Sequence, residues 1–315
     1  MSAKIKILVT DPISDVAIQT LVKEGFDVTA KELGSDDLLK SIKDYDVLVV
    51  RSRTKVTKEV INAGSKLRII ARAGVGLDNI DVNAAKAKNI SVINSPEAPS
   101  VSVAELVFGF MLSIARSISL ADASLKNGKW IKQSLEGFEL RNKTLGIIGF
   151  GRIGREVAKR AISFEMRVLA FDTMPQSLTD AKKLGVEAVG TDRMAFEKLV
   201  RNSDFITIHV PSLPETHHMF GQKEFSLMKK GAVLINAARG GIIEESSLLN
   251  ALKEGKIGGV GLDVFEEEPP KNTDLIKLSN VVCTPHIGAQ TKEAQESAGN
   301  IIAGKIVEAF KKRRV

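Results

Sequence analysis

The sequence predicts an α/β protein with two doubly wound parallel sheets. Short apolar runs rich in β-branched residues alternate with stretches of helical periodicity along nearly the whole chain. The alternation occurs twice, once before and once after a long apolar stretch at residues 100–126. Strands that are separated by helices pair in parallel through right-handed crossovers, so each series predicts one parallel sheet.

The first series covers residues 5–94. Its runs with strand character are residues 5–10, 26–30, 46–51, 67–71 and 90–94. Residues 13–23 and 82–88 lie between such runs and carry apolar side chains at helical spacing, which predicts helices there.

Residues 100–126 predict one long helix. Pro99 lies just before them, and the hydroxyl of Ser100 or Ser102 is a suitable N-terminal cap. One broad apolar face contains Val103, Leu106, Val107, Phe110, Met111 and Ile114.

The second series follows with no low-complexity linker. Its strand-like runs are residues 144–149, 167–172, 205–210, 233–237, 260–265 and 281–284. Residues 292–311 predict a closing helix.

Composition limits the classes of function. The 315 residues suffice for about two domains, and 43% apolar with 26% charged residues excludes a disordered or coiled-coil chain. Aromatic residues are only 5%, so stacking of nucleic-acid bases is not expected. The net charge is +7, but Lys and Arg alternate with Asp and Glu along most of the chain, which is typical of a solvated surface. The basic run at residues 311–314 is interpreted as a solvated tail. An excess of positive charge attracts small anionic substrates.

Cysteine usage and hydropathy indicate the compartment. One cysteine, Cys283, allows no disulfide within the chain, which favours a reducing environment. No apolar run approaches the roughly 20 residues of a membrane helix, and Lys4 and Lys6 interrupt any signal-peptide pattern. We therefore expect a cytoplasmic protein with no membrane partner, no nucleic-acid partner and no metal site.

A glycine-rich loop follows the first strand of the second series. Gly149 allows a tight turn, Gly151 lets the backbone approach a pyrophosphate, and Gly154 lets the next helix pack closely on the strand. Asp172 ends the following strand, 18 residues after Gly154, where its carboxylate would accept hydrogen bonds from ribose hydroxyls and repel a 2′-phosphate. This pattern predicts NAD rather than NADP. The alternative is a turn that only packs, with Asp172 as a helix cap.

Three charged residues follow later strands of the second series: Arg239, Glu268 and His286. Ligands of open parallel sheets bind beyond the carboxyl ends of the strands. A histidine base, a carboxylate that orients it and an arginine that grips a carboxylate are what NAD-linked oxidation of a hydroxy acid requires. The alternatives are a turn or core histidine and a solvated acidic run around Glu268.

With these motifs the sequence resembles the NAD-dependent D-2-hydroxyacid dehydrogenases. The carrying segments are residues 71–81, 149–154, 236–241, 261–270 and 285–289, in order along nearly the whole chain. The resemblance implies a Rossmann dinucleotide-binding domain at residues 99–288, inserted in a discontinuous flavodoxin-like substrate domain at residues 1–98 and 289–315. It also implies a homodimer through the helical region at residues 99–127.

The resemblance also implies roles for individual residues. Arg239 binds the substrate carboxylate and keto oxygen, His286 is the acid/base, Glu268 pairs with His286, and the backbone N–H groups of Val75 and Gly76 hold the carboxylate from the other side. Asp172 takes the adenosine ribose, and Asp263 meets the nicotinamide amide. The expected cofactor contacts are Gly149, Gly151, Arg152, Ile153, Gly154, Asp172, His209, Val210, Pro211, Ala237 and Asp263.

Relatives in this family act on lactate, glycerate, glyoxylate or bulkier acids with the same three residues. Arg51 and Arg72 resemble positions that grip a 3-phosphate, and Lys132 could add a cation across the dimer. We therefore expect interconversion of 3-phospho-D-glycerate and 3-phosphohydroxypyruvate, the first step of serine synthesis. The alternatives are surface ion pairing of these arginines, a glyoxylate or hydroxypyruvate reductase, and an NADH-sensing protein resembling transcriptional corepressors.

Two features depart from the pattern of the phosphoglycerate-oxidising members. His209 stands where those often have Thr or another small residue. The chain also stops soon after the last predicted helix, so feedback by serine through a C-terminal regulatory domain is not expected.

Overall fold

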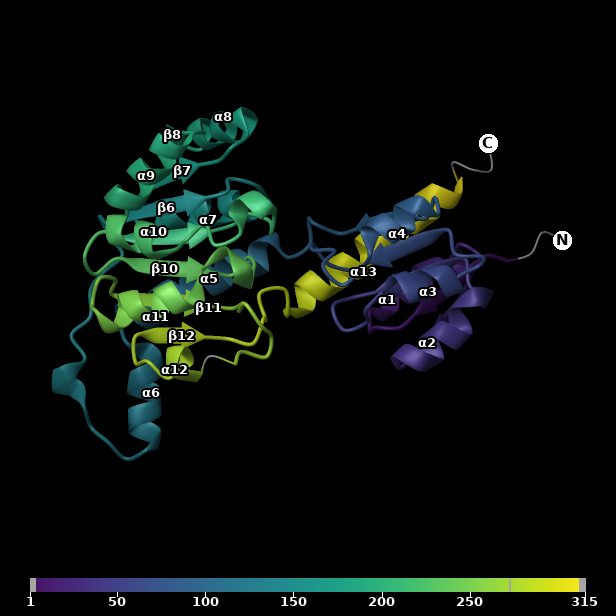
Figure 1. The fold of residues 1–315 in the computed structure, drawn as a ribbon, viewed down its shortest axis with the longest axis horizontal. Helices are drawn as coiled ribbons and strands as arrows, with labels where there is room; N and C mark the ends of the chain where they lie inside the picture. Colours follow the sequence, from purple (N-terminus) through teal and green to yellow (C-terminus); the bar gives the residue numbers. More distant parts are fainter. Residues whose placement is uncertain (1–3, 272, 312–315) are drawn as a thin grey trace. The chain divides into compact units, whose positions relative to one another are not determined.

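The computed structural model describes residues 4–271 and 273–311, so residues 312–314 of the basic run lie outside the described part. The chain divides into two compact units, whose helices and strands are drawn in Figure 1. Unit 1 comprises Met1–Pro99 with Ala289–Val315, and unit 2 comprises Ser100–Gly288. Each contains one parallel sheet with helices packed against it, which confirms the predicted α/β class.

Unit 1 holds a five-stranded sheet in the order β2-β1-β3-β4-β5, the flavodoxin-like order. The strands are β1 (Lys6–Val9), β2 (Asp27–Ala30), β3 (Val47–Val50), β4 (Ile69–Arg72) and β5 (Ser91–Asn94). The helices are α1 (Asp15–Lys23), α2 (Ser35–Ser41), η1 (Ile42–Asp44), α3 (Lys58–Ala63), α4 (Val82–Ala87) and α13 (Lys292–Lys311).

The sheet of unit 1 has one hydrophobic core on each face, because side chains along its strands point to alternate faces. Ile7 and Val9 face one side with α1 and α13, whereas Leu8 faces the other side with α2, α3 and α4. Because successive side chains of a strand point to opposite faces, an unbroken apolar run serves both cores at once. Gly299 lets α13 approach α1, since a Cβ there would lie 2.9 Å from Ser14 Oγ.

Unit 2 holds a seven-stranded sheet in the order β12-β11-β10-β9-β6-β7-β8. The strands are β6 (Thr144–Ile148), β7 (Arg167–Phe171), β8 (Glu187–Gly190), β9 (Phe205–Ile208), β10 (Val233–Asn236), β11 (Gly259–Leu262) and β12 (Val281–Cys283). The helices are α5 (Ser100–Ala115), α6 (Ile118–Lys126), η2 (Lys132–Ser134), α7 (Arg152–Ser163), α8 (Pro175–Lys183), α9 (Arg193–Asn202), η3 (Pro214–Thr216), α10 (Gln222–Leu227), η4 (Gly240–Ile242), α11 (Glu245–Lys253) and α12 (Thr273–Ile276).

The helix α5 lies in the core of unit 2. Its residues Val107, Phe110 and Met111 join a cluster with β6, β10 and α7. A Cβ at Gly261 would lie 2.7 Å from the Phe110 ring, so the glycine in β11 admits this helix to the face of the sheet. The opposite face is covered by α9, α10 and α11. The carboxyl ends of the parallel strands of unit 2 lie along one edge of the sheet. The loops that follow them, with Gly149, Arg239, Glu268 and His286, therefore lie along that edge.

The prediction of one helix over residues 100–126 is wrong. Ser117 adopts a left-handed conformation (φ 52°), and α5 and α6 meet at a bend of 67°. The Phe138 N–H donates to Ala115 O at 2.9 Å, so a later segment takes up a carbonyl that continued helix would have used. Figure 1 shows α6 lying apart from the body of unit 2. Apolar periodicity does not reveal such a break, because it carries over from α5 into α6.

The predicted helix at residues 292–311 is confirmed as α13, whereas β8 and several short helices of both units were not expected. Among residues 4–271 and 273–311, no single helix has the length and hydropathy to cross a membrane. Within the described part of the chain, one bent pair, α5 with α6, meets the length and hydropathy criteria when the two helices are taken together, and much of α5 is buried within unit 2.

Candidate active site

Glu268 and His286 follow adjacent strands of unit 2 and meet beyond them. Glu268 comes after β11 and His286 after β12, and these strands pair in parallel. His286 Nδ1 lies 2.8 Å from Glu268 Oε2, and 48% of the His286 side chain is exposed. An ionised carboxylate only accepts, so it selects the tautomer in which Nδ1 carries the proton. The other ring nitrogen, Nε2, is then an acceptor that can take a proton from a ligand.

Asp263 holds the loop that carries His286. Its Oδ1 accepts from Thr284 Oγ1 at 2.6 Å and from the Ile287 N–H at 2.7 Å, and its Oδ2 accepts from the Gly288 N–H at 2.7 Å. His286 itself has a left-handed φ of 55°, which is uncommon for a residue with a side chain. These charge-assisted bonds stabilise an unfavourable backbone and so aim the imidazole. Both oxygens of Asp263, expected at the nicotinamide, are therefore engaged within the protein.

Arg239 follows β10, the next strand along the same edge. The buried Asn236 fixes its turn, because Asn236 Nδ2 donates to Arg239 O at 2.9 Å and Asn236 Oδ1 accepts from the Ala238 N–H at 3.0 Å. A Cβ at Gly240 would lie 1.8 Å from Phe265 O, so only glycine lets the Arg239 turn pack on the segment that leads to Glu268. In the structure, Arg239 Nη1 donates to Ala238 O at 2.7 Å. Arg239, Glu268 and His286 thus follow three neighbouring strands.

The glycine loop fits the pyrophosphate of a dinucleotide. Gly149 has a left-handed φ of 89°, and a Cβ there would lie 2.5 Å from His209 O. A Cβ at Gly154 would lie 2.3 Å from Gly149 O, whereas at Gly151 nothing lies within 4 Å. The loop is thus tight on its protein side and open at Gly151. The helix α7 begins there with no side-chain cap and no acidic residue in its first turn. Its N-terminal N–H groups are therefore left to an anion, and no carboxylate repels that anion.

Asp172 ends β7 beside the glycine loop. Its Oδ2 accepts from the Phe150 N–H at 2.8 Å, and its Oδ1 accepts from the Met174 N–H at 2.8 Å. Each carboxylate oxygen has further acceptor capacity, so these bonds do not prevent contact with ribose hydroxyls. They place a negative charge next to the loop, which is the arrangement expected for NAD.

His209 packs behind the glycine loop. Its backbone N–H donates to Ile148 O at 2.7 Å, and its ring Nε2 lies 3.0 Å from Thr207 Oγ1. The ring Nδ1 is buried with no hydrogen-bond partner in the described part of the chain. Burial lowers the pKa of His209 to about 3. The backbone at residues 209–210 therefore shapes the cradle, while the imidazole stays neutral.

This burial predicts a pH-dependent stability. Between pH 7 and 5 the unfolded chain protonates His209, with a pKa near 6.5, but the folded chain does not, so folding loses about 2 kcal/mol of stability. A His209→Gln variant, which can keep a bond to Thr207, should lose about that much less over the same interval. Urea unfolding at both pH values measures the difference. Parallel losses in the two proteins would contradict the assignment.

In unit 1, Arg51 and Arg72 lie at the carboxyl ends of the adjacent strands β3 and β4, where Val50 pairs with Arg72. Arg51 Nη1 lies 3.4 Å from Gln295 Oε1, and its Nη2 lies 3.3 Å from Gln290 Oε1. Burial lowers the pKa of Arg51, which nevertheless remains a cation at neutral pH.

The loop with Val75 and Gly76 follows β4 in the same unit. Asn94 Nδ2 donates to Val75 O at 2.6 Å, and Arg72 Nη1 donates to Gly76 O. The carbonyl oxygens of both loop residues are thus held inside unit 1. Lys132, predicted to act across a dimer, is exposed at the start of η2 in unit 2.

Sequence reasoning identified neither Asn236, nor the close packing that requires glycine at Gly240, nor the loop-holding role of Asp263. Asn236 and Asp263 are polar residues that are 0% and 1% exposed at the ends of apolar strands. A polar residue at that position is the available signal, because a buried polar group must find partners. Which loops those partners belong to depends on strand order, which local sequence does not contain.

Comparison with known proteins gives one consistent result. Residues 108–288 match the family described as "D-isomer specific 2-hydroxyacid dehydrogenase, NAD binding domain". The chain is 51% identical over 308 residues to D-3-phosphoglycerate dehydrogenase of Methanocaldococcus jannaschii, covering 98% of this chain and 58% of that protein. It is 49% identical over 308 residues to hydroxypyruvate reductase of Thermotoga maritima, covering 96% of this chain and 98% of that protein.

The chain is also similar to solved structures. D-lactate dehydrogenase from Aquifex aeolicus, complexed with NAD and lactic acid, superimposes with a TM-score of 0.82 at 30% identity. The match covers 98% of this chain and 95% of that one.

Proposed function

Because the chain belongs to the D-isomer specific 2-hydroxyacid dehydrogenase family, we propose that it interconverts a D-2-hydroxy acid and the corresponding 2-keto acid with NAD. The observation that carries the proposal is the 2.8 Å contact between His286 Nδ1 and Glu268 Oε2 at the strand edge that also bears Arg239. A protein that only binds a dinucleotide needs no such base, which argues against the NADH-sensing alternative.

The protein's own groups perform the proton transfer and the orientation of substrate. The glycine loop and Asp172 would hold NAD, which would supply the hydride acceptor for oxidation of the hydroxy acid. His286 Nε2 takes the hydroxyl proton during oxidation and returns it during reduction, while Glu268 keeps the ring in the required tautomer and stabilises its protonated form. Arg239 grips the carboxylate through its planar fork. The backbone N–H groups of Val75 and Gly76 in unit 1 are proposed as further donors to the same carboxylate.

We further propose 3-phospho-D-glycerate and 3-phosphohydroxypyruvate as the substrate pair, in the first step of serine synthesis. Arg51 and Arg72 support this, because they place two cations at neighbouring strand ends of unit 1. The M. jannaschii relative is named for this substrate. The second candidate is hydroxypyruvate reduction, favoured by the T. maritima relative, which matches over 98% of its own length.

A double replacement of Arg51 and Arg72 with Ala separates these candidates. Loss of charge-assisted bonds to a dianionic phosphate should lower the ratio of kcat/KM for 3-phosphoglycerate to that for D-glycerate by about 100-fold. An Arg141→Ala variant, which removes an exposed ion pair with Glu165 in unit 2, is the matched control and should keep the ratio. NADH formation with both acids measures it. An unchanged ratio in the double variant would leave hydroxypyruvate reduction as the better assignment.

We also propose a homodimer through the α5–α6 region. The helix α6 has no buried residue, and its apolar residues Ile118, Leu120 and Leu125 are 52%, 40% and 58% exposed. Beyond it, Trp130 is 79% exposed. An apolar surface of this kind is typical of a subunit interface. Light scattering should give twice the 34.1 kDa chain mass, and charged replacements of Leu120 and Leu125 should give the monomer. A monomeric wild type at micromolar concentration would contradict the proposal.

A further inference from the structure

The loop that carries Arg51 is fixed at both of its ends by two polar side chains, Asp11 and Asn79. Asp11 follows β1, and Asn79 lies between β4 and α4. The loop runs from Arg51 to Thr54 and follows β3, which lies between β1 and β4 in the sheet. We refer to the pair as the Asp11–Asn79 clamp.

Asp11 accepts the backbone N–H groups of the loop. Its Oδ2 accepts from the Arg51 N–H at 2.6 Å and from the Thr54 N–H at 3.1 Å. Its Oδ1 accepts from Thr54 Oγ1 at 2.7 Å and from Arg53 Nε at 3.3 Å. Asp11 is only 2% exposed, so a buried carboxylate is fully satisfied by this one loop.

Asn79 donates to the backbone carbonyls of the same two residues. Its Nδ2 lies 2.8 Å from Arg51 O and 2.6 Å from Thr54 O. Its Oδ1 is buried with no hydrogen-bond partner within the described residues. A buried acceptor without a partner costs about 1–3 kcal/mol of stability. The two hydrogen bonds donated by Nδ2 are therefore the interactions that explain an amide at this position. The clamp therefore ties both the N–H and the C=O of Arg51 and of Thr54.

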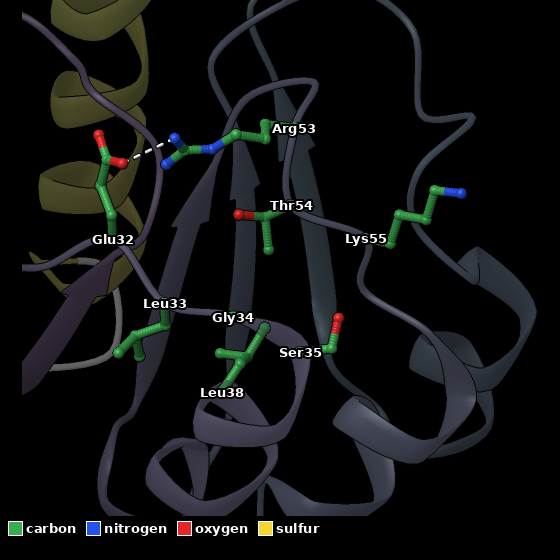
Figure 2. Close-up of a pocket in the computed structure, with 8 residues that line it drawn as sticks. All are labelled: Glu32, Leu33, Gly34, Ser35, Leu38, Arg53, Thr54 and Lys55. Carbon is green, nitrogen blue, oxygen red and sulfur yellow. Dashed lines mark hydrogen bonds and ion pairs between the residues drawn. The ribbon is translucent and has the colours of Figure 1, made fainter. Parts of the chain in front are cut away.

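The two arginines of the loop, Arg51 and Arg53, contact different neighbours. Arg53 Nη1 lies 2.7 Å from Glu32 Oε2, and both residues line a cavity of about 610 Å³ that Thr54 and Lys55 also line. Figure 2 shows the Arg53 guanidinium directed at Glu32 and the Lys55 side chain pointing away from both. Arg51 instead reaches neutral acceptors through long bonds, to Gln290 Oε1 at 3.3 Å, Gln295 Oε1 at 3.4 Å and Pro12 O at 3.4 Å. A phosphate would replace such weak partners more readily than the carboxylates that hold Arg53.

We propose that Asp11 and Asn79 are positioning residues that set substrate specificity, by fixing the backbone of Arg51 so that its guanidinium is preorganised for the phosphate of the substrate. The inference rests on the proposed phosphorylated substrate. Two backbone bonds to Arg51, and two more to Thr54 at the far end of the loop, leave the Arg51 Cα little freedom, so less ordering is needed when the anion binds. The clamp belongs to unit 1, whereas Arg239 and His286 belong to unit 2, and so it should act on phosphate selection rather than on hydride transfer.

The test compares kcat/KM for 3-phosphoglycerate and D-glycerate in the full chain. Asn79→Ala and Asp11→Asn should each lower the ratio about 10- to 100-fold, mainly through KM for 3-phosphoglycerate, with D-glycerate nearly unchanged. Thr54→Val removes the hydroxyl bonds to Asp11 Oδ1 and Thr10 Oγ1 but keeps the backbone bonds of the clamp, so it should shift the ratio less, in the same direction. The exposed residues Asn62 and Asp37 provide matched controls, since Asn62→Ala and Asp37→Asn make the same chemical changes outside the clamp.

A double-mutant cycle with Arg51→Ala separates specificity from folding. If the clamp acts through Arg51, Asn79→Ala should have no further effect on the ratio once Arg51 is removed. Equal losses on both substrates, or an effect that persists without Arg51, would overturn the inference. So would a wild-type ratio in the folded clamp variants when Arg51→Ala lowers it, and the proposed substrate would then stand. If Arg51→Ala itself leaves the ratio unchanged, the proposed substrate fails instead. Should Asp11→Asn fail to fold, Asn79→Ala and Thr54→Val decide the outcome.

Discussion

Replacement of His286 with Asn is expected to lower kcat by about 10²–10⁴-fold in both directions, the range that a general acid/base contributes. The amide can neither take nor return the substrate proton at the position of Nε2. The glycine loop and Asp172 lie on other strands of the sheet, so binding of NADH should be unchanged. Steady-state rates and NADH fluorescence titration measure the two effects.

Glu268→Gln provides the companion variant for His286. The amide of Gln keeps the size of the side chain but removes the charge that stabilises a protonated imidazole 2.8 Å away. We expect a smaller loss of kcat than in His286→Asn, again with unchanged NADH binding. The double variant should be no slower than His286→Asn alone, because Glu268 acts through the histidine. A His286→Asn enzyme with the wild-type rate would refute the assignment of the base.

Replacement of Arg239 with Gln is expected to lower kcat/KM by about 10²–10⁴-fold. Two charge-assisted bonds to the substrate carboxylate, each contributing about 1.5–3 kcal/mol, are lost. Asn236 and Gly240 hold the turn through backbone atoms, so the fold should tolerate the change of side chain. Kinetics with the 2-keto acid and NADH measure the loss.

Arg239→Lys tests whether geometry or charge matters at this position. The ammonium keeps the positive charge but has no planar fork, so we expect only partial recovery over Arg239→Gln. Unchanged thermal unfolding of both variants provides the control for folding. Full activity of Arg239→Lys would show that the carboxylate is not gripped in a bidentate manner.

Much of the architecture could be predicted because the strands are strongly patterned. The continuous apolar run of β3, for example, is buried on both faces, and such runs between helices identify a parallel sheet. The break at Ser117 could not be predicted, because the carbonyl that ends α5 is taken by Phe138, a residue far along the chain. The strand β8 was missed because its residues Glu187–Gly190 include a glycine and no long apolar run.

The candidate site, like the fold, could be predicted from the sequence only in part. By itself, the sequence determined the fold class, the glycine loop with Asp172, and the identities of Arg239, Glu268 and His286, because these signals lie in residue type and short spacing. Only the tertiary structure decided that Asp263 holds the His286 loop, that Gly240 admits the Arg239 turn, and that Asp11 and Asn79 fix Arg51. Those relations join residues from different strands, and the order of strands in a sheet decides which buried polar group finds which partner.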